Sequence, residues 1–170
     1  MKGYIHLYTG NGKGKTTAAI GLAIRAVGAG KRVFIAQFVK GMHYAELETL
    51  KQIPGIEVRQ YGLDCFIKNK PTRKDIDAAR AGLTEVTRII SKNSVDVLIL
   101  DEICIALYYH LFEEDEVIRL LKAKPTAMEI VLTGRYAPKA LYEIADLVTE
   151  MNEVKHYYNK GVQARKGIEF

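Results

Sequence analysis

An apolar segment, a turn rich in glycine and lysine, and a helical pattern follow one another in "YIHLYTGNGKGKTTAAIGLAIRA" (residues 4–26). Five of the eight residues from Gly10 to Thr17 are glycine or lysine. Glycines let the backbone turn sharply and direct several N–H groups at one anion, and the following helix adds its positive dipole end. This strand–turn–helix sequence predicts a phosphate-binding loop within an α/β fold.

The loop is slightly short by comparison with the usual G-x-x-x-x-G-K-[ST] pattern. If Gly14, Lys15 and Thr16 fill the last three positions, Thr9 stands where the first glycine belongs. In the usual loop, the lysine contacts phosphate oxygens and the hydroxyl is a ligand of Mg²⁺. We therefore expect Lys15 to bind phosphate and Thr16 to bind Mg²⁺, in a loop that lacks one residue.

Strand-like and helix-like segments alternate along the chain, which is 170 residues long. Apolar runs predict strands at 4–8, 32–38, 56–61, 95–101, 128–134 and 146–154. Spacings of three and four predict helices at 15–27, 73–92, 113–123 and 138–145. Thr72 and Asp75 resemble a capping box at the start of the helix at 73–92. We predict a single domain over 1–170, a three-layer α/β/α phosphate-loop (RecA-like) fold with a mostly parallel central sheet.

Composition narrows the class of protein. The hydrophobic content of 48% is that of a globular protein, and no apolar run reaches the roughly 20 residues that cross a bilayer. Two cysteines, Cys65 and Cys104, cannot make a disulfide framework or a four-cysteine zinc site. The net charge of +5 is spread along the chain, which favours a phosphorylated small molecule over nucleic acid. We expect a cytoplasmic protein without nucleic-acid or membrane partners.

A second signal is the acidic pair Asp101-Glu102, which closes the buried strand "VLILDE". A carboxylate at this place can hold Mg²⁺ directly or through water, as the Walker B aspartate does. Alternatively, the pair begins the next helix, where negative charge is also favoured. In many ATPases the second acid orients the attacking water, so these residues alone would suggest ATP hydrolysis.

Other candidates follow from position, because ligands of open α/β sheets bind beyond the carboxyl ends of the strands. Gln37 and Lys40 in "QFVKG" sit at the end of the second strand, and Arg135 ends "LTGR". Arg135 would contact phosphate or ribose, or else be a surface arginine after a turn. Arg25 lies in the first predicted helix, and its spacing does not show whether the side chain points to the site or into solvent. No arrangement of a nucleophile and a base stands out along the chain.

With these residues in view, the sequence resembles the phosphate-loop type of ATP:cob(I)alamin adenosyltransferase, the corrinoid adenosyltransferases. The matching segments are "TGNGKGKTTAAIGLAIRAVGAGKRV", "QFVKG", "VLILDE", "IVLTGR", "ADLVTEM" and "VKHYYNKGVQARKGIEF". Members of this family use a shortened loop with ATP in the reversed sense, which accounts for the missing residue. The resemblance implies that the Co(I) of a reduced corrinoid attacks the ribose C5′ and displaces triphosphate.

The resemblance also implies a role for each residue of the loop. The triphosphate would be held by Gly10, Asn11, Gly12, Lys13, Gly14, Lys15, Thr16 and Thr17. Lys13 and Lys15 would neutralise the charge that builds up on the leaving group. Glu102, the third expected catalytic residue, would bind Mg²⁺ together with Thr16, with Asp101 nearby.

Two further contacts are carried over from the family. Arg25 matches a family arginine near the nucleotide. The corrinoid-facing loop of the relatives carries a phenylalanine and a tryptophan, and "YGLDCFIKNK" (61–70) has Phe66, neighbouring Leu63 and no tryptophan. Phe66 is therefore the expected corrinoid contact. The resemblance further implies a homodimer and a flavodoxin-like or flavin reductant for the corrinoid.

Two rival interpretations remain at this point. One is a RecA-like ATPase or a small-molecule kinase that uses Asp101 and Glu102 in the conventional way. The other is a regulatory module in which bound ATP alters the surface offered to a partner. Turnover of ATP that depends on a reduced corrinoid would separate the adenosyltransferase from both.

Overall fold

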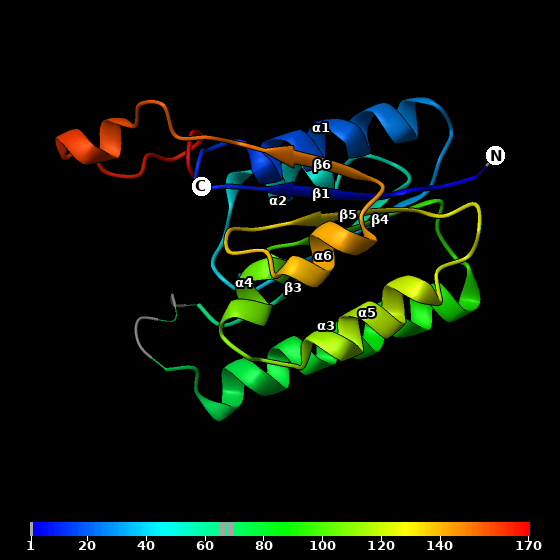
Figure 1. Cartoon of the computed structure of the whole chain (residues 1–170). Coiled ribbons are helices and arrows are strands. Elements are labelled where there is room, and N and C mark those ends of the chain that lie inside the picture. Colours follow the sequence, from blue (N-terminus) through cyan, green and yellow to red (C-terminus); the bar gives the residue numbers. More distant parts are fainter. Residues whose placement is uncertain (1, 65–66, 68–69) are drawn as a thin grey trace.

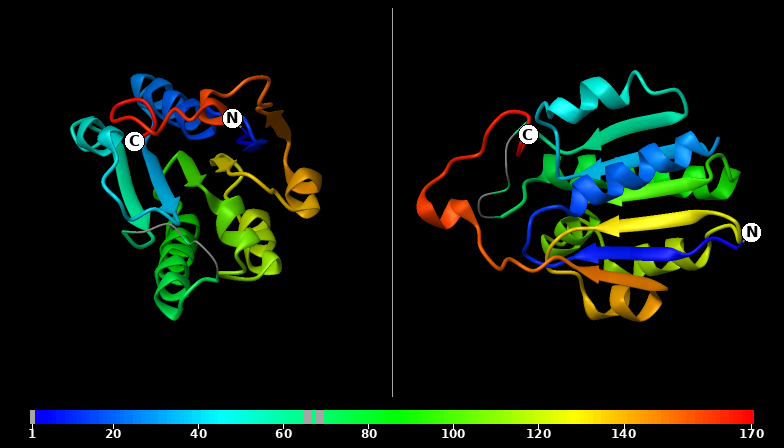
Figure 2. Two further views of the ribbon diagram at one scale, coloured as in Figure 1. Left: turned by 90° about the vertical axis from the view of Figure 1, so that its left-hand side faces the viewer. Right: turned by 90° about the horizontal axis from the view of Figure 1, so that it is seen from above.

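The computed structural model describes residues 2–64, 67 and 70–170. In this part of the chain, strands form one sheet: β1 (Ile5–Thr9), β2 (Val33–Phe38), β3 (Ile56–Tyr61), β4 (Val97–Asp101), β5 (Glu129–Thr133) and β6 (Leu147–Glu150). The strand order is β3-β2-β4-β5-β1-β6, and each neighbouring pair is parallel. The carboxyl ends therefore share one edge, toward which the arrows point in Figure 2.

Helices cover both faces of this sheet. They are α1 (Lys15–Gly28), α2 (Ala45–Leu50), α3 (Arg73–Lys92), α4 (Ile103–Tyr108), α5 (Glu114–Lys122), α6 (Lys139–Ile144) and the 3₁₀ helix η1 (Tyr157–Lys160). Figure 1 shows α1 on one side of the sheet and α3 and α5 on the other. The described helices include none that is long and apolar enough to span a membrane.

The alternation of side chains along β4 explains the three layers. Leu98 and Leu100 belong to the core cluster that contains residues of α3, α4 and α5. Val97 and Ile99 belong to the opposite cluster, with alanines of α1. Because successive strand residues point to opposite faces, a strand that is apolar throughout needs a cover on both. The predicted three-layer α/β/α class is confirmed, and the sheet is parallel in all its pairs.

The prediction and the structure agree best for the helix that has both a capping box and a long repeat of apolar residues. The helix predicted at 73–92 is α3, with the same bounds. The Thr72 hydroxyl accepts from the Asp75 N–H, and the Asp75 carboxylate accepts from the Thr72 N–H at 2.7 Å. This reciprocal pair is the predicted capping box, which satisfies two backbone donors that the helix itself leaves free.

Two differences from the prediction concern the edge at which the strands end. The last strand stops at Glu150 and not at residue 154, because Met151 turns toward the phosphate loop. Its carbonyl accepts a hydrogen bond from the Gly12 N–H at 2.6 Å. The short helices α2 and α4, of six residues each, were not predicted. Six residues are too few to display the repeat of a helical pattern.

Candidate nucleotide-binding site

The phosphate loop joins β1 to α1 and needs its glycines for two different reasons. Gly10 and Gly14 have φ values of 91° and 119°, which side chains on L-residues rarely adopt. A Cβ on Gly12 would lie 2.7 Å from the carbonyl oxygen of Met151, which is closer than real Cβ atoms come. The loop is thus packed against the chain that follows β6, and bulkier residues could not form it.

Lys15 begins α1 and points into this loop. The residue is 6% exposed, and its ammonium donates to the carbonyls of Gly10 and Gly12, both at 2.7 Å. Burial lowers the pKa of Lys15, although the carboxylate of Glu102 acts in the opposite direction. A buried cation within the loop gives an anion a partner of opposite charge at the N-terminus of α1.

Asp101 is the centre of a buried polar network at the end of β4. One carboxylate oxygen accepts from the hydroxyls of Thr16 and Thr133, at 2.8 and 2.7 Å. The other accepts from Lys40 at 2.7 Å and from Gln37 at 3.3 Å. Burial would raise the pKa of Asp101, but the Lys40 ammonium and the hydroxyl donors outweigh it and lower this pKa. Asp101 is therefore ionised and fully engaged.

Glu102 is placed differently, although it is the next residue. Its φ of 59° is unusual for a residue other than glycine, and its N–H donates to the Thr133 hydroxyl at 2.9 Å. Burial and the neighbouring Asp101 raise the pKa of Glu102. This left-handed turn directs the Glu102 side chain to a cavity that Asp101 does not line. Strained backbone of this kind often occurs at functional sites.

The cavity has a volume of about 700 Å³ and lies beyond the carboxyl ends of the strands; we call it the nucleotide cavity. The predicted residues that line it are Gly12, Lys13, Gly14, Lys15, Thr16, Thr17, Lys40, Glu102 and Arg135. The residues that were not predicted are Met42, His43, Tyr44, Glu46, Glu153, His156, Tyr158, Ala164, Ile168, Glu169 and Phe170. The last seven come from residues 153–170, which we call the C-terminal segment. The resemblance of "VKHYYNKGVQARKGIEF" (154–170) to the family was the sequence signal that pointed to it.

A second cavity, of about 390 Å³, adjoins the first. The residues lining both are Lys40, Tyr44, Glu102 and Arg135. The second cavity is completed by Val39, Ile67, Ile105 and three tyrosines, Tyr108, Tyr109 and Tyr136. The rings of Tyr108 and Tyr136 lie 4.5 Å apart between centroids. The shared residues make the two cavities neighbours at the same edge of the sheet.

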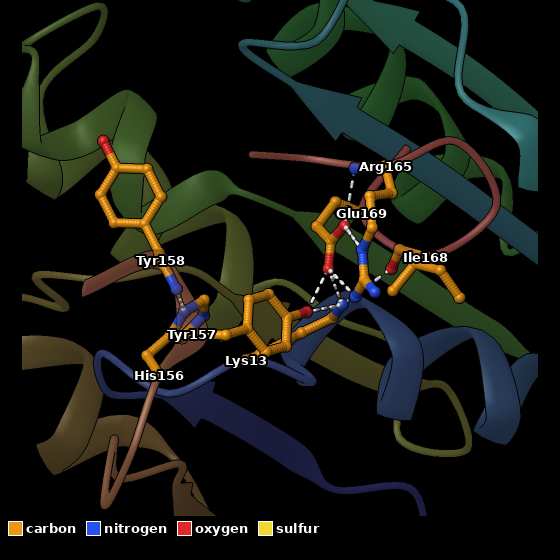
Figure 3. A network of polar contacts seen from close by, with 7 residues as sticks. All are labelled: Lys13, His156, Tyr157, Tyr158, Arg165, Ile168 and Glu169. Carbon is orange, nitrogen blue, oxygen red and sulfur yellow. Dashed lines mark hydrogen bonds and ion pairs between the residues drawn. The ribbon is translucent and has the colours of Figure 1, made fainter. Parts of the chain in front are cut away.

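Lys13 also points to the C-terminal segment (Figure 3). Its ammonium lies 2.7 Å from a carboxylate oxygen of Glu169, 2.9 Å from the Ile168 carbonyl and 3.1 Å from the Tyr157 hydroxyl. The hydrogen bond and charge of Glu169 raise the pKa of Lys13. The two lysines of the loop thus have separate partners.

Other predicted residues are not brought to the nucleotide cavity. Arg25 is exposed on the last turn of α1 and is not among the described residues that line it. Gly10 and Asn11 belong to the loop without lining the cavity. Phe66 lies outside the described residues, so its corrinoid contact stays a prediction.

These features define a phosphate-loop nucleotide-binding protein: a parallel sheet, a glycine-rich loop before a helix, and a buried aspartate at the end of a neighbouring strand. A solved structure of a KaiC-like protein from Pyrococcus horikoshii OT3 has the same fold. Its TM-score is 0.54 at 16% identity, over 91% of this chain and 74% of that one. A likeness at this identity concerns the fold alone.

The chain belongs to the ATP:corrinoid adenosyltransferase family, because residues 1–170 match the family described as ATP:corrinoid adenosyltransferase BtuR/CobO/CobP. The corrinoid adenosyltransferase of Escherichia coli K12 is 35% identical over 99% of this chain and 86% of its own length. The Salmonella typhimurium LT2 enzyme named CobA is also 35% identical, with the same coverage. A corrinoid adenosyltransferase from Sinorhizobium sp. is 38% identical, over 99% of this chain and 81% of its own.

Family membership confirms the predicted class of enzyme. The chain is a corrinoid adenosyltransferase, a transferase with ATP and a corrinoid as its substrates. The shortened phosphate loop thus occurs in an enzyme that transfers the adenosyl group and not a phosphoryl group.

Proposed function

We propose that the phosphate loop of this adenosyltransferase holds the triphosphate of ATP as a leaving group, with the ribose C5′ directed at the Co(I) of a reduced corrinoid. The observation that carries this proposal is the position of Lys15, which is buried inside the loop at the floor of the nucleotide cavity. Lys15 and the N-terminus of α1 place positive charge where the leaving group would gather negative charge.

The electron pair for the new bond comes from the corrinoid. As the Co–C5′ bond forms, the C5′–O bond breaks and its electrons pass to the triphosphate oxygen, so no proton moves in this step. Among the described residues, the thiol is that of Cys104, two residues after Glu102. Burial raises the pKa of this thiol to about 12. Such a thiol stays protonated at neutral pH, which agrees with a nucleophile supplied by the substrate.

Mg²⁺ fits the same site, with Thr16 and Glu102 as its protein ligands. Both side chains line the nucleotide cavity beside Lys15, and both offer the hard oxygen donors that Mg²⁺ prefers. Among the described residues, no cluster of three or more histidines, cysteines and carboxylates could hold a metal. Two protein oxygens suit Mg²⁺, which takes its other ligands from phosphate and water. Asp101, already engaged by four side chains, would position the Thr16 hydroxyl. When bound, the ion would neutralise charge on the triphosphate.

The corrinoid would lie near the 61–70 segment, with Phe66 as a contact. In support, Ile67 of this segment lines the second cavity, which shares Glu102 and Arg135 with the nucleotide cavity. Phe66→Ala should reduce corrinoid use at saturating ATP and leave ATP affinity unchanged, as steady-state rates and titration calorimetry would reveal. Equal losses of both would place the corrinoid elsewhere.

A homodimer and a flavodoxin-like or flavin reductant complete the proposal. The edge strand β6 is exposed along its whole length and presents Leu147 and Val148, which are 43% and 40% exposed. An exposed apolar strand edge is a surface that proteins usually cover. Light scattering that gives the mass of one chain would contradict the dimer.

The family resemblance also implies that Arg25 lies near the nucleotide. If Arg25→Ala leaves ATP affinity unchanged, Arg25 does not contact the nucleotide.

The reaction itself is tested by its products. The protein is incubated without oxygen with ATP, Mg²⁺ and a chemically reduced corrinoid, and phosphorus NMR follows the phosphates. We expect a light-sensitive adenosylcorrinoid and intact triphosphate in equal amounts, with little ATP turnover when the corrinoid is left out. Orthophosphate and ADP formed independently of the corrinoid would contradict the proposed arrangement and favour a conventional ATPase site.

A further inference from the structure

The C-terminal segment, residues 153–170, follows β6 and lies beyond the carboxyl edge of the sheet (Figures 1 and 2). It is mostly exposed and contains only the short helix η1. Its side chains nevertheless line one side of the nucleotide cavity: Glu153, His156, Tyr158, Ala164, Ile168, Glu169 and Phe170. An exposed segment of this kind needs a specific attachment to stay over the site.

Lys13 supplies that attachment. An ammonium group has three N–H donors, and the Lys13 ammonium faces three acceptors, on Tyr157, Ile168 and Glu169. All three belong to the C-terminal segment, so in this arrangement Lys13 has no donor left for a phosphate. The residue connects the phosphate loop to a part of the chain that is about 150 positions away.

Glu169 is the other half of the attachment. Its carboxylate accepts from Lys13, from the Tyr157 hydroxyl and from the Arg165 N–H at 2.7 Å. The Arg165 guanidinium lies over the Tyr157 ring, 4.9 Å from its centroid, and completes the cluster in Figure 3. These donors, Lys13 first, hold the pKa of Glu169 far below its usual range.

The two sides of the nucleotide cavity differ in chemistry. The loop side is cationic and lined by backbone, which suits phosphate oxygens. The opposite side offers mainly rings and apolar groups, among them His156, Tyr158 and Phe170, beside the carboxylates of Glu153 and Glu169. A triphosphate would fill only part of about 700 Å³, and the remaining space beside aromatic side chains suits a purine nucleoside.

We propose that the C-terminal segment forms the nucleoside-facing wall of the ATP site, and that the Lys13–Glu169 ion pair attaches this wall to the phosphate loop. Lys13 and Glu169 are then positioning residues, and Lys15 is the lysine that contacts the triphosphate. The inference rests on the proposed binding of ATP in the nucleotide cavity. It assigns Lys13 a role different from the neutralisation of the leaving group that the family resemblance implies.

Two probes separate the wall from the loop: ATP, which has a nucleoside, and inorganic triphosphate, which has none. In Glu169→Gln, titration calorimetry should show ATP affinity reduced about tenfold, while triphosphate affinity changes less than about twofold. The matched control is Glu143→Gln, which removes the same charge from an exposed ion pair outside the cavity. The Glu143 carboxylate pairs with Lys139 of α6 and does not line the nucleotide cavity, so ATP affinity should be retained.

A double-mutant cycle tests whether Lys13 acts through Glu169. Lys13→Ala combined with Glu169→Gln should lose no more ATP affinity than either single variant, because both changes break the same attachment. Lys13→Arg should restore ATP affinity, since a guanidinium also pairs with a carboxylate. If Lys13→Ala weakens triphosphate as much as it weakens ATP, then Lys13 binds phosphate directly and the proposal is wrong.

Hydrogen exchange gives an independent readout. Amides of residues 153–170 should exchange faster in Glu169→Gln, and ATP should slow them in the unaltered protein more than triphosphate does. If the unaltered protein binds neither probe, the proposed function fails. If it binds both, and Glu169→Gln changes neither affinity, only the wall is disproved.

Discussion

Lys13 and Lys15 stand two residues apart in the phosphate loop and have opposite surroundings. Lys15 is buried, and burial lowers its pKa, whereas the Lys13 side chain is 41% exposed and its pKa is raised by Glu169. The family resemblance gives both lysines the same role, the neutralisation of charge on the leaving group. Their partners distinguish them, because one lysine is held by the loop itself and the other by the C-terminal segment.

The same contrast extends to the two sides of the nucleotide cavity. Next to the cavity, at the ends of β2 and β4, the Lys40–Asp101 pair is 12% and 1% exposed. The C-terminal side rests on the Lys13–Glu169 pair at the surface. A buried pair that loses one partner destabilises the fold, while an exposed pair contributes little to it. We therefore expect that breaking the buried Lys40–Asp101 pair affects folding, and that breaking the Lys13–Glu169 pair affects only the binding of the ligand.

The largest effect is expected for Asp101→Asn, which leaves the Lys40 ammonium buried without a carboxylate. The free energy of unfolding should fall by about 3–5 kcal/mol, as measured by urea denaturation. The matched control is Asp96→Asn at the opposite end of β4. Asp96 pairs with Arg32, and these side chains are 40% and 60% exposed. Its loss should therefore cost below about 1 kcal/mol. Equal losses of unfolding free energy in the two variants would contradict the expected difference between the buried and the exposed ion pair.

The stability that Asp101 contributes should also depend on pH. Its pKa in the folded protein is lowered, so the unfolded state takes up the proton first as the pH falls. The contribution is complete above the unfolded pKa of about 3.9 and is lost as the pH falls through the lower, folded pKa. Denaturation at a series of acidic pH values should show the difference between the unaltered protein and Asp101→Asn shrink over that range.

Lys15→Ala should have the next largest effect, this time on the ligand. Losing a charge-assisted contact to phosphate costs about 1.5–3 kcal/mol, or about 10- to 150-fold in affinity. Since the contact is to the triphosphate, calorimetry should show similar losses for ATP and for inorganic triphosphate. Lys31→Ala, at an exposed lysine beyond α1, should change neither. An unaltered affinity in Lys15→Ala would remove the loop from the ATP site.

A structural feature could be predicted from the sequence when the residues that determine it lie close together along the chain or follow a general rule of the fold. The α3 boundaries follow from a cap and a repeat that lie within the helix, and the meeting of Lys15, Thr16 and Glu102 follows from the shared edge of parallel strands. The contact between Lys13 and Glu169 has no such rule, because it depends on the path of an exposed segment after β6. The family resemblance pointed to that segment but not to its place.

Glu102→Gln should have a smaller effect than Lys15→Ala on ATP binding and a clear effect on the Mg²⁺ requirement. The amide keeps the size of the side chain and removes the charge, so the concentration of Mg²⁺ for half-maximal rate should rise about 10- to 100-fold. Burial and Asp101 raise the pKa of Glu102. As the pH falls, Glu102 should therefore take up a proton, and Mg²⁺ should be released, at a higher pH than for a glutamate with an ordinary pKa. A normal rate at low Mg²⁺ would exclude Glu102 as a ligand.

The smallest effect on folding is expected for Glu169→Gln, and this variant tests the contrast between the buried and the exposed ion pair most sharply. The carboxylate contacts Lys13, Tyr157 and Arg165 but lies outside both core clusters. Global unfolding exposes little additional apolar surface around Glu169. The thermal midpoint should therefore be unchanged, while amides of 153–170 exchange faster. If the midpoint instead fell as far as it does in Asp101→Asn, the C-terminal segment would be part of the folded core. The loss of ATP affinity would then reflect unfolding and not a displaced wall.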